Sequence, residues 1–307
     1  MEEQSKKVII IALFGNLFIA VSKFASAFIT GSSAILSEGI HSLIDTGNEG
    51  FLLLGLHMAK KPADELHPFG HGKEIYFWSF VVAILIFAVG SGISVYEGIH
   101  NILHPAHIEN TLINYIVIGI AFMFEGTSWT FALKNFNKMR NGRGYIRTAH
   151  TAKDPSTFIV LFEDSAALAG LIIAGLGIFL EQTTGNTIYD SLASIIIGLI
   201  LAVTASWLAY ETKGLLIGES ASREIISEIK SVLSDFDAIG HVNEIPTMHV
   251  CPHYILVNLS VEFKDLVSAV DVENNIELMD KKIKSRNGDI KRIFIESESF
   301  KKKENTG

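Results

Sequence analysis

Long apolar segments dominate the first two thirds of this chain of 307 residues. A helix needs about 20 mainly apolar residues to cross the hydrocarbon core of a bilayer. Six segments reach roughly that length: 8–29, 33–57, 75–100, 112–133, 157–180 and 189–213. As buried helices of a soluble protein, they would need far more polar cover than the chain supplies. The pattern therefore predicts six transmembrane helices.

Composition supports two domains that face different solvents. Hydrophobic residues make up 49% of the chain and charged residues 19%, whereas an ordinary soluble domain is about one quarter charged. The apolar excess lies before residue 218, so we expect a six-helix transmembrane domain over 1–217 and a soluble domain over 218–307. The net charge of −8 and the lack of a basic block exclude nucleic acid as a partner. The lone cysteine, Cys251, excludes an intrachain disulfide.

Basic residues predict how the six segments are oriented. They lie before the first segment and in the connectors after the second and fourth: Lys6, Lys7, Lys60, Lys61, Lys73, Lys134, Lys138, Arg140, Arg143, Arg147 and Lys153. The other connectors contain no lysine or arginine. By the positive-inside rule, both termini of this multi-pass protein are cytoplasmic. In a prokaryote, the membrane would be the cell (inner) membrane.

The C-terminal part has the periodicities of a small soluble fold. Helices are predicted over Arg223–Leu233 and Val272–Ile283, and strands over His241–His249, Tyr254–Phe263 and Asp289–Ile295. This αββαβ order predicts a small α+β domain in which the helices cover one face of a sheet.

The second apolar segment contains ionisable residues, which are costly inside a membrane and therefore point to function. His41 and Asp45 lie one helical turn apart, so their side chains share a face. Imidazole and carboxylate are both good zinc ligands. The alternative is a His–Asp hydrogen bond that only stabilises helix packing.

Other charged residues lie in the predicted helices. Glu163 and Asp164 are adjacent in the fifth helix and point about 100° apart, so one of them can face the His–Asp pair. Glu125 is expected to be protonated and hydrogen-bonded to a neighbour such as Ser128. Lys23 is expected to extend its ammonium group to the membrane surface.

The connector after the second helix has the spacing of a metal site. Asp64, His67 and His71 follow one another at steps of three and four residues. Solvated histidines with no bound metal are the alternative for this loop.

Four features together resemble the cation diffusion facilitators, a family of proton-coupled exporters of zinc and related metals. The resemblance covers nearly the whole chain. Within the family, the chain resembles the mitochondrial zinc transporter subgroup. Its motifs are the His41-x-x-x-Asp45 pair, the sequence His67-Pro-Phe-Gly-His71-Gly-Lys73-Glu74, Asp164 six residues before Gly170, and Asp190 at the start of the last helix.

The resemblance implies a homodimer, a ferredoxin-like cytoplasmic domain and a four-ligand transport site. His41, Asp45 and Asp164 would supply three of the ligands. The family's usual fourth position is Val160 here, so we expect Glu163 to replace it, with Asn48 or water as alternatives. Lys73 would form a charged interlock at the dimer interface, with an acidic partner near Glu219.

The expected function is the exchange of Zn²⁺ for H⁺ by alternating access. Metal ligands must lose their protons, so binding of the ion releases protons. An oxygen-rich site also suits Mn²⁺, Fe²⁺ or Co²⁺, and a membrane-anchored metal sensor that transports nothing is a further alternative. No nucleophile–base pair or phosphate-binding loop is visible, so we do not expect an enzyme.

Overall fold

The computed structural model describes residues 2–105, 107–108, 110–140, 144–151 and 153–299. Within these ranges, side chains are not described for 2–14, 139, 150–151 and 156–157. The basic residues Lys6, Lys7 and Arg143 therefore lie outside the described side chains. The chain forms two compact units, one of Met1–Lys60 and Glu74–Lys213, the other of Lys61–Lys73 and Gly214–Gly307.

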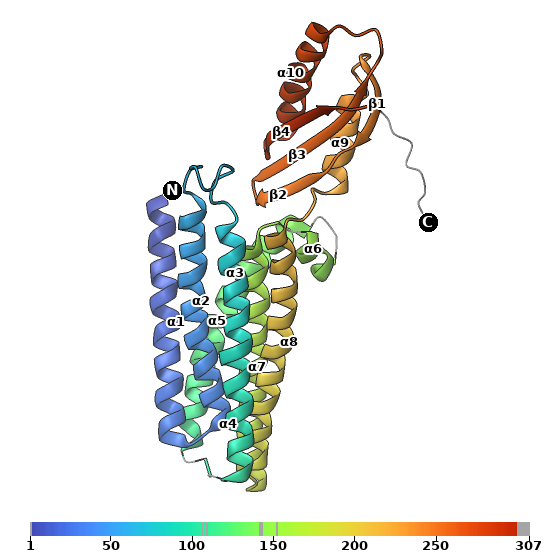
Figure 1. Ribbon diagram of the computed structural model, residues 1–307. Helices are drawn as coiled ribbons and strands as arrows, with labels where there is room; N and C mark the ends of the chain where they lie inside the picture. Colours follow the sequence, from blue (N-terminus) through green and yellow to red (C-terminus); the bar gives the residue numbers. More distant parts are fainter. Residues whose placement is uncertain (1, 106, 109, 141–143, 152, 300–307) are drawn as a thin grey trace, which may run out of the picture. The chain divides into compact units, whose positions relative to one another are not determined.

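The first unit is a bundle of long helices that lie side by side (Figure 1). Its elements are α1 Glu2–Thr30, α2 Ser33–Ala59, α3 Glu74–Leu85, η1 Ile86–Ser91, α4 Gly92–Leu103, α5 Thr111–Arg140, α6 Tyr145–Thr151, α7 Pro155–Thr184 and α8 Ile188–Ile217. The segment η1 is a π-helical stretch that joins α3 and α4 into one helical run. Each of the six predicted segments corresponds to a helix or helical run, and the prediction that all six cross the membrane stays a prediction. The short helix α6 is an addition that periodicity did not predict.

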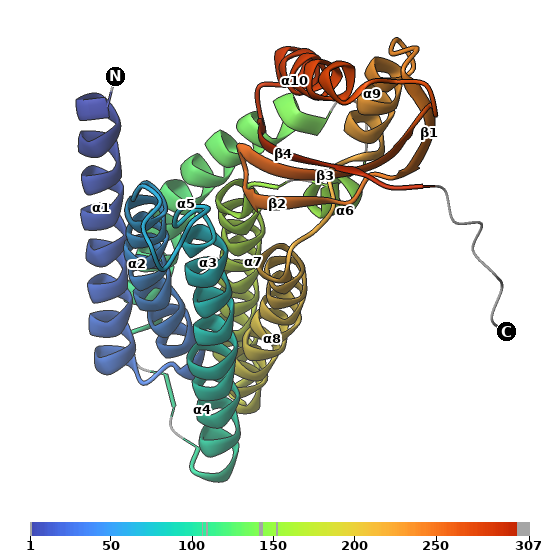
Figure 2. The same ribbon diagram turned by 45° about the horizontal axis from the view of Figure 1, so that its top comes forward.

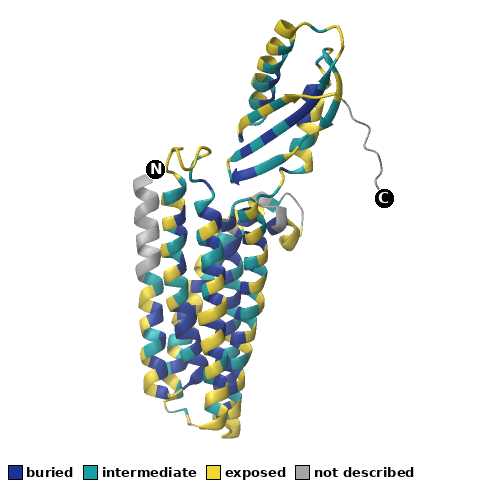
Figure 3. Ribbon diagram, viewed as in Figure 1, coloured by how far each residue is buried: buried dark blue, intermediate teal, exposed yellow. Residues whose placement is uncertain are grey.

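The surface of the bundle is apolar. Four described helical runs are long and apolar enough to cross a membrane, namely Glu74–Leu103, Thr111–Lys138, Phe158–Thr184 and Ile188–Ile217. Large side chains on the outside of the bundle include Phe28 (94% exposed), Met123 (74%) and Val203 (71%). Figure 3 shows exposed residues, in yellow, along the length of the helices. An apolar surface of this extent is suited to lipid rather than water. The chain is therefore an integral membrane protein.

Glycines allow close helix packing inside the bundle. A Cβ atom on Gly98 of α4 would lie 2.5 Å from Ile195 Cγ1, and one on Gly198 of α8 would lie 2.7 Å from Val95 Cγ2. Both distances are too short for a real side chain. The backbones of α4 and α8 thus approach as closely as small residues at membrane helix interfaces permit.

A buried carboxylate caps the first turn of α2. Asp190 of α8 is 1% exposed and accepts hydrogen bonds from Ser32 Oγ at 2.6 Å, from the amide of Ser33 at 2.6 Å and from the amide of Ala34 at 3.3 Å. Unpaired amides and the positive end of the helix dipole favour an anion at this position. The start of α2 is thereby fixed to α8.

The second unit contains a four-stranded sheet and two helices. Its elements are α9 Arg223–Leu233, β1 Ile239–Glu244, β2 Thr247–Cys251, β3 Tyr254–Phe263, α10 Ala269–Arg286 and β4 Ile290–Ser297. Strand β3 pairs antiparallel with β1 and β2, and parallel with β4. The predicted strand His241–His249 is wrong in one respect, because it is divided into β1 and β2. Proline lacks the amide hydrogen that a continuous ladder uses, and Pro246 lies at the break.

Both helices of this unit lie on one side of the sheet (Figure 2). Alternate residues of β3 point toward them, and the buried core consists of Ala221, Ile229, Val232, Leu233, Ile255, Val257, Leu259, Met279, Ile283 and Ile290. A helical membrane bundle followed by a small α+β domain confirms the predicted fold class.

The connector Lys61–Lys73 packs with the second unit. The rings of Phe69 and Phe294 make an edge-to-face contact with centroids 6.4 Å apart. A Cβ atom on Gly72 would lie 2.8 Å from Cys251 Cβ, so only glycine fits there without a shift. The domain boundary at residues 217 and 218 remains a prediction, and the place of this connector was not foreseen.

Candidate metal sites

Helix α2 places His41 and Asp45 together inside the bundle. His41 Nδ1 lies 3.4 Å from Asp45 Oδ1, and the two residues are 1% and 18% exposed. Among the described residues, neither ring nitrogen of His41 has a hydrogen-bond partner, and neither does Asp45 Oδ1. Buried polar atoms are normally satisfied. The pair therefore presents ligand atoms that no hydrogen bond satisfies in the described structure. A metal site, rather than a His–Asp contact that only stabilises packing, stays a prediction.

Helix α7 brings two acids to the same region. Glu163 accepts a hydrogen bond from Asn48 Nδ2 of α2 at 2.5 Å, and it lines the same cavity as Asp45. Asp164 instead accepts one from Ser128 Oγ of α5 at 2.8 Å. Of the two adjacent acids, Glu163 is thus the one that contacts α2.

A cavity of about 40 Å³ lies beside Asp45, Glu163 and Asp164, and His41 is not part of its lining. A site of this size is large enough for a water-sized occupant. Its lining comes from α1, α2, α5 and α7 and consists of Asn16, Ile19, Ser42, Asp45, Glu49, Leu52, Glu125, Ser128, Val160, Glu163 and Asp164. Val160 faces the cavity with an apolar side chain, while Glu163 follows it one turn later on the same wall.

The donor set suits a divalent cation. Zinc commonly takes four ligands of the imidazole and carboxylate kinds. In the described structure Asp45, Glu163 and Asp164 line the cavity and His41 lies beside Asp45, but no three of these four residues bring ligand atoms within 4.8 Å of one another. The unpartnered nitrogens of His41 are the strongest indication that something other than protein completes the site. The assignment of His41, Asp45, Asp164 and Glu163 as ligands stays a prediction.

The contacts of Lys23 and Glu125 differ from those that the sequence predicted. Lys23 does not reach the membrane surface: it is 0% exposed and forms ion pairs with Glu38 at 3.0 Å and Glu125 at 2.8 Å. Glu125 therefore pairs with a cation rather than with Ser128. Hydropathy alone cannot reveal this, because the partners lie on three different helices.

Sequence reasoning also missed a polar contact beside the cavity. Asn16 Nδ2 of α1 donates to Glu49 Oε1 at 2.8 Å. Glu49 follows Asp45 by four residues, so the spacing that singled out His41 and Asp45 also pointed to it. The contribution of α1 had no such signal.

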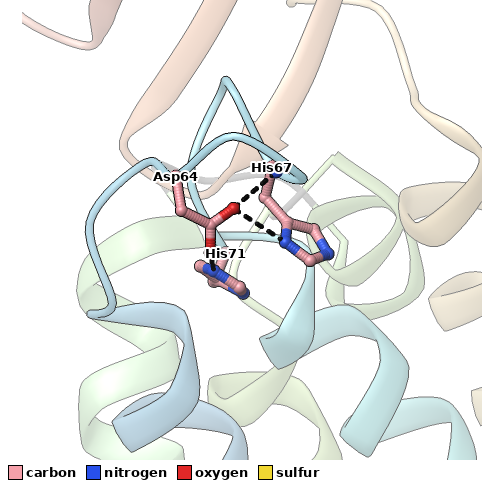
Figure 4. Close-up of side chains that lie close together, drawn as sticks. All are labelled: Asp64, His67 and His71. Atoms are coloured by element: carbon pink, nitrogen blue, oxygen red, sulfur yellow. Dashed lines mark hydrogen bonds and ion pairs between the residues drawn. The ribbon is translucent and has the colours of Figure 1, made fainter.

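A second cluster lies in the connector after α2 (Figure 4). Asp64 Oδ2 lies 2.9 Å from His71 Nε2, and Asp64 Oδ1 lies 3.2 Å from His67 Nδ1. One ligand atom from each residue lies within 4.8 Å of the other two. The loop thus brings together the three residues that their spacing singled out, and their chemistry suits zinc.

The carboxylate of this cluster is held in its ionised form. Hydrogen bonds from the side chain of His71 and the backbone amide of His67 lower the pKa of Asp64 to about 2. Hydrogen bonds to a charged carboxylate favour that form. Asp64 is therefore deprotonated at neutral pH, as a metal ligand must be.

The predicted interlock residues both lie in the second unit. Lys73 Nζ is 4.0 Å from Met248 Sδ and lies near Gly218, the residue before Glu219. The backbone carbonyl of Glu219 accepts a hydrogen bond from the amide of His249 at 2.9 Å. A role for Lys73 and Glu219 at a dimer interface stays a prediction.

Comparison with known proteins adds family evidence. A family model described as the cation efflux transmembrane domain matches residues 9–217. The human protein named "Proton-coupled zinc antiporter SLC30A9, mitochondrial" is 32% identical over 241 residues, which cover 78% of this chain and 42% of that protein. This chain thus spans less than half the length of that relative.

Two other relatives match more of their own length. "Metal tolerance protein C4" of Arabidopsis thaliana is 30% identical over 267 residues, covering 85% of this chain and 58% of that protein. "Manganese efflux system protein MneP" of Bacillus subtilis is 23% identical over 295 residues, covering 96% of both chains. The printed name of the human relative thus specifies zinc, and that of the Bacillus subtilis relative specifies manganese.

Proposed function

This chain belongs to the cation efflux family, and on that premise we propose that it exchanges a divalent metal ion, zinc in the first place, for protons by alternating access. A cation efflux transporter needs a polar site inside its membrane helices. The transported ion would bind His41 and Asp45 of α2 together with Asp164 and Glu163 of α7. The observation that carries this proposal is a cavity lined by Asp45, Glu163 and Asp164, where Asp45 Oδ1 and the ring nitrogens of the neighbouring His41 have no hydrogen-bond partner among the described residues.

The placement of Asp45 and Glu163 supports proton coupling. Asp45 and Glu163 both line the same small cavity, and two neighbouring carboxylates share a site more easily when one of them carries a proton. A divalent ion that binds both groups would displace that proton. Metal and proton would then compete for the same oxygens, which is the basis of an exchange mechanism.

The choice of metal follows from the ligand types and from the printed names of two relatives. The printed name of the human relative specifies zinc, and His41 offers the imidazole that zinc favours. The printed name of the Bacillus subtilis relative specifies manganese, and the replacement of a nitrogen ligand by Glu163 makes the site richer in oxygen, which favours harder ions. We therefore place zinc first and manganese second, with Fe²⁺ and Co²⁺ as further candidates.

The proposed arrangement in the membrane has six spans and cytoplasmic termini. The four described runs of sufficient length and hydropathy would be joined by α1 and α2. The lysines and arginines at one set of helix ends support this orientation. We propose further that the protein is a homodimer, with Lys73 and Glu219 at its interface, and that the second unit faces the cytoplasm.

Transport by the purified full chain tests the function. In proteoliposomes with a pH gradient, Zn²⁺ uptake should be coupled to proton movement in the opposite direction, detected by a pH-sensitive dye inside the vesicles. Parallel assays with Mn²⁺, Fe²⁺ and Co²⁺ would rank the metals. The absence of ion flux with all four metals, in protein that is monodisperse and correctly inserted, would refute the transport function.

The loop cluster gives a separate prediction. Replacing both His67 and His71 by alanine should lower the zinc bound per chain by about one ion, because Asp64 alone is too weak a ligand to hold it. The measurement is metal analysis of the purified protein after dialysis at a fixed free zinc concentration.

A matched control for this variant is His253→Ala, in the same unit, where the side chain is 83% exposed. It should leave the bound zinc unchanged. Equal zinc content in all three proteins would show that Asp64, His67 and His71 form an exposed hydrogen-bonded loop and no metal site.

A further inference from the structure

The ammonium group of Lys23 is buried where α1, α2 and α5 meet. Lys23 of α1 donates to Glu38 Oε2 at 3.0 Å and to Ser42 Oγ at 2.8 Å, both of α2, and to Glu125 Oε1 of α5 at 2.8 Å. An ammonium group has three hydrogens, and each has an acceptor here. Lys23 is thus fully coordinated by the protein.

The charges of this group do not balance by themselves. Two carboxylates face one ammonium, and among the described residues Glu38 Oε1 and Glu125 Oε2 are buried without hydrogen-bond partners. Glu38 Oε1 presses against the backbone of α7, since a Cβ atom on Gly170 would lie only 2.1 Å from it. Lys23 and Glu38 thus form a buried ion pair, with both side chains 0% exposed.

This network adjoins the proposed transport site. Ser42 and Glu125, two of the three partners of Lys23, line the cavity that also contains Asp45, Glu163 and Asp164. Glu38 precedes His41 by one helical turn. A divalent ion bound in this region would therefore lie close to the charges of the network, and such charges interact strongly where water is excluded.

We propose that Lys23 is a built-in counter-ion of the transport site, an inference that rests on the proposed function. Its positive charge repels the divalent ion and remains in place when that ion leaves. The metal is therefore held less tightly than the carboxylates alone would hold it, and the empty site is less strongly negative. Lys23 is a positioning residue in this account and contacts no metal.

Two substitutions of opposite charge test the inference. Lys23→Gln removes a repulsive charge and should lower the Zn²⁺ dissociation constant and the KM for transport about tenfold, with a fall in maximal rate because release is slower. Glu38→Gln removes one of the two negative charges beside Lys23 and should raise the Zn²⁺ dissociation constant and the KM for transport about tenfold. Lys23→Arg keeps the charge and should stay near the original values.

The double variant Lys23→Gln with Glu38→Gln restores the local charge balance. Its dissociation constant should return to within about threefold of the original, because the two opposite effects cancel; the threefold margin allows for the coupling between neighbouring residues. Zn²⁺ affinity is measured on the detergent-solubilised full chain by competition with a fluorescent chelator, and transport in proteoliposomes.

The outcomes separate this inference from its premise. A purely structural role for Lys23 predicts that both single variants weaken binding in the same direction, and this result, or unchanged constants in both, would overturn the counter-ion role while leaving transport intact. If the single variants do not insert, the arginine and double variants still decide, because a double variant with strongly altered affinity contradicts the role. The absence of Zn²⁺ flux in the unmodified protein would instead refute the proposed function.

Discussion

Replacing Asp45 by asparagine is expected to reduce zinc-driven proton flux at least about 100-fold. Mutation of groups that merely orient metal ligands already costs about 10- to 100-fold in affinity or activity, and Asp45 is proposed as a ligand itself. Asparagine has nearly the same shape as aspartate, so the bundle should remain folded. The flux is measured in proteoliposomes that contain a pH-sensitive dye, under an imposed zinc gradient.

The control makes the same chemical change at an exposed position. Asp265→Asn, in the turn after β3, should transport like the original protein. Full flux in the Asp45→Asn protein would remove the His41–Asp45 pair from the mechanism and with it the main reason for placing the site between α2 and α7.

The second prediction concerns the missing fourth ligand. Glu163→Gln alone should reduce zinc transport about 100-fold if Glu163 is that ligand, for the same reason as above. Adding Val160→His to this variant should restore transport to within about tenfold of the original, because the side chain at position 160 lines the cavity. The restored site would have two imidazoles, so it should also prefer zinc over manganese more strongly than the original protein does.

Competition between Zn²⁺ and Mn²⁺ in the uptake assay measures this preference. Val160→Leu combined with Glu163→Gln is the matched control, since leucine fills the same space without a ligand atom, and it should remain inactive. Rescue by leucine would show that packing rather than coordination is restored. Undiminished transport in Glu163→Gln would leave water or Asn48 as the fourth ligand.

Much of the fold followed from the sequence. The apolar segment predicted over 33–57 corresponds to α2 over Ser33–Ala59, and that predicted over 157–180 corresponds to α7 over Pro155–Thr184. Hydrophobic length and helical spacing determine such elements locally. The break at Pro246 had a visible cause in the sequence, but the strands on either side were still predicted as one.

The site was predictable only along a single helix. The spacing of His41 and Asp45 fixes their common face, whereas the contacts of Asn48 with Glu163 and of Ser128 with Asp164 depend on how α2, α5 and α7 are rotated against each other. The burial of Lys23 is the clearest case. A lysine near a helix end normally extends toward water, and only the meeting of Glu38, Ser42 and Glu125 around it reverses that expectation.

The membership of the connector Lys61–Lys73 in the second unit has a consequence for truncation. The polypeptide passes between the two units three times, after Lys60, after Lys73 and after Lys213. Deleting everything beyond Lys213 would take away Phe294 and Cys251, the residues on which Phe69 and Gly72 pack. Such a truncation would remove more than the C-terminal domain. The loop that carries Asp64, His67 and His71 would also lose the residues on which it packs.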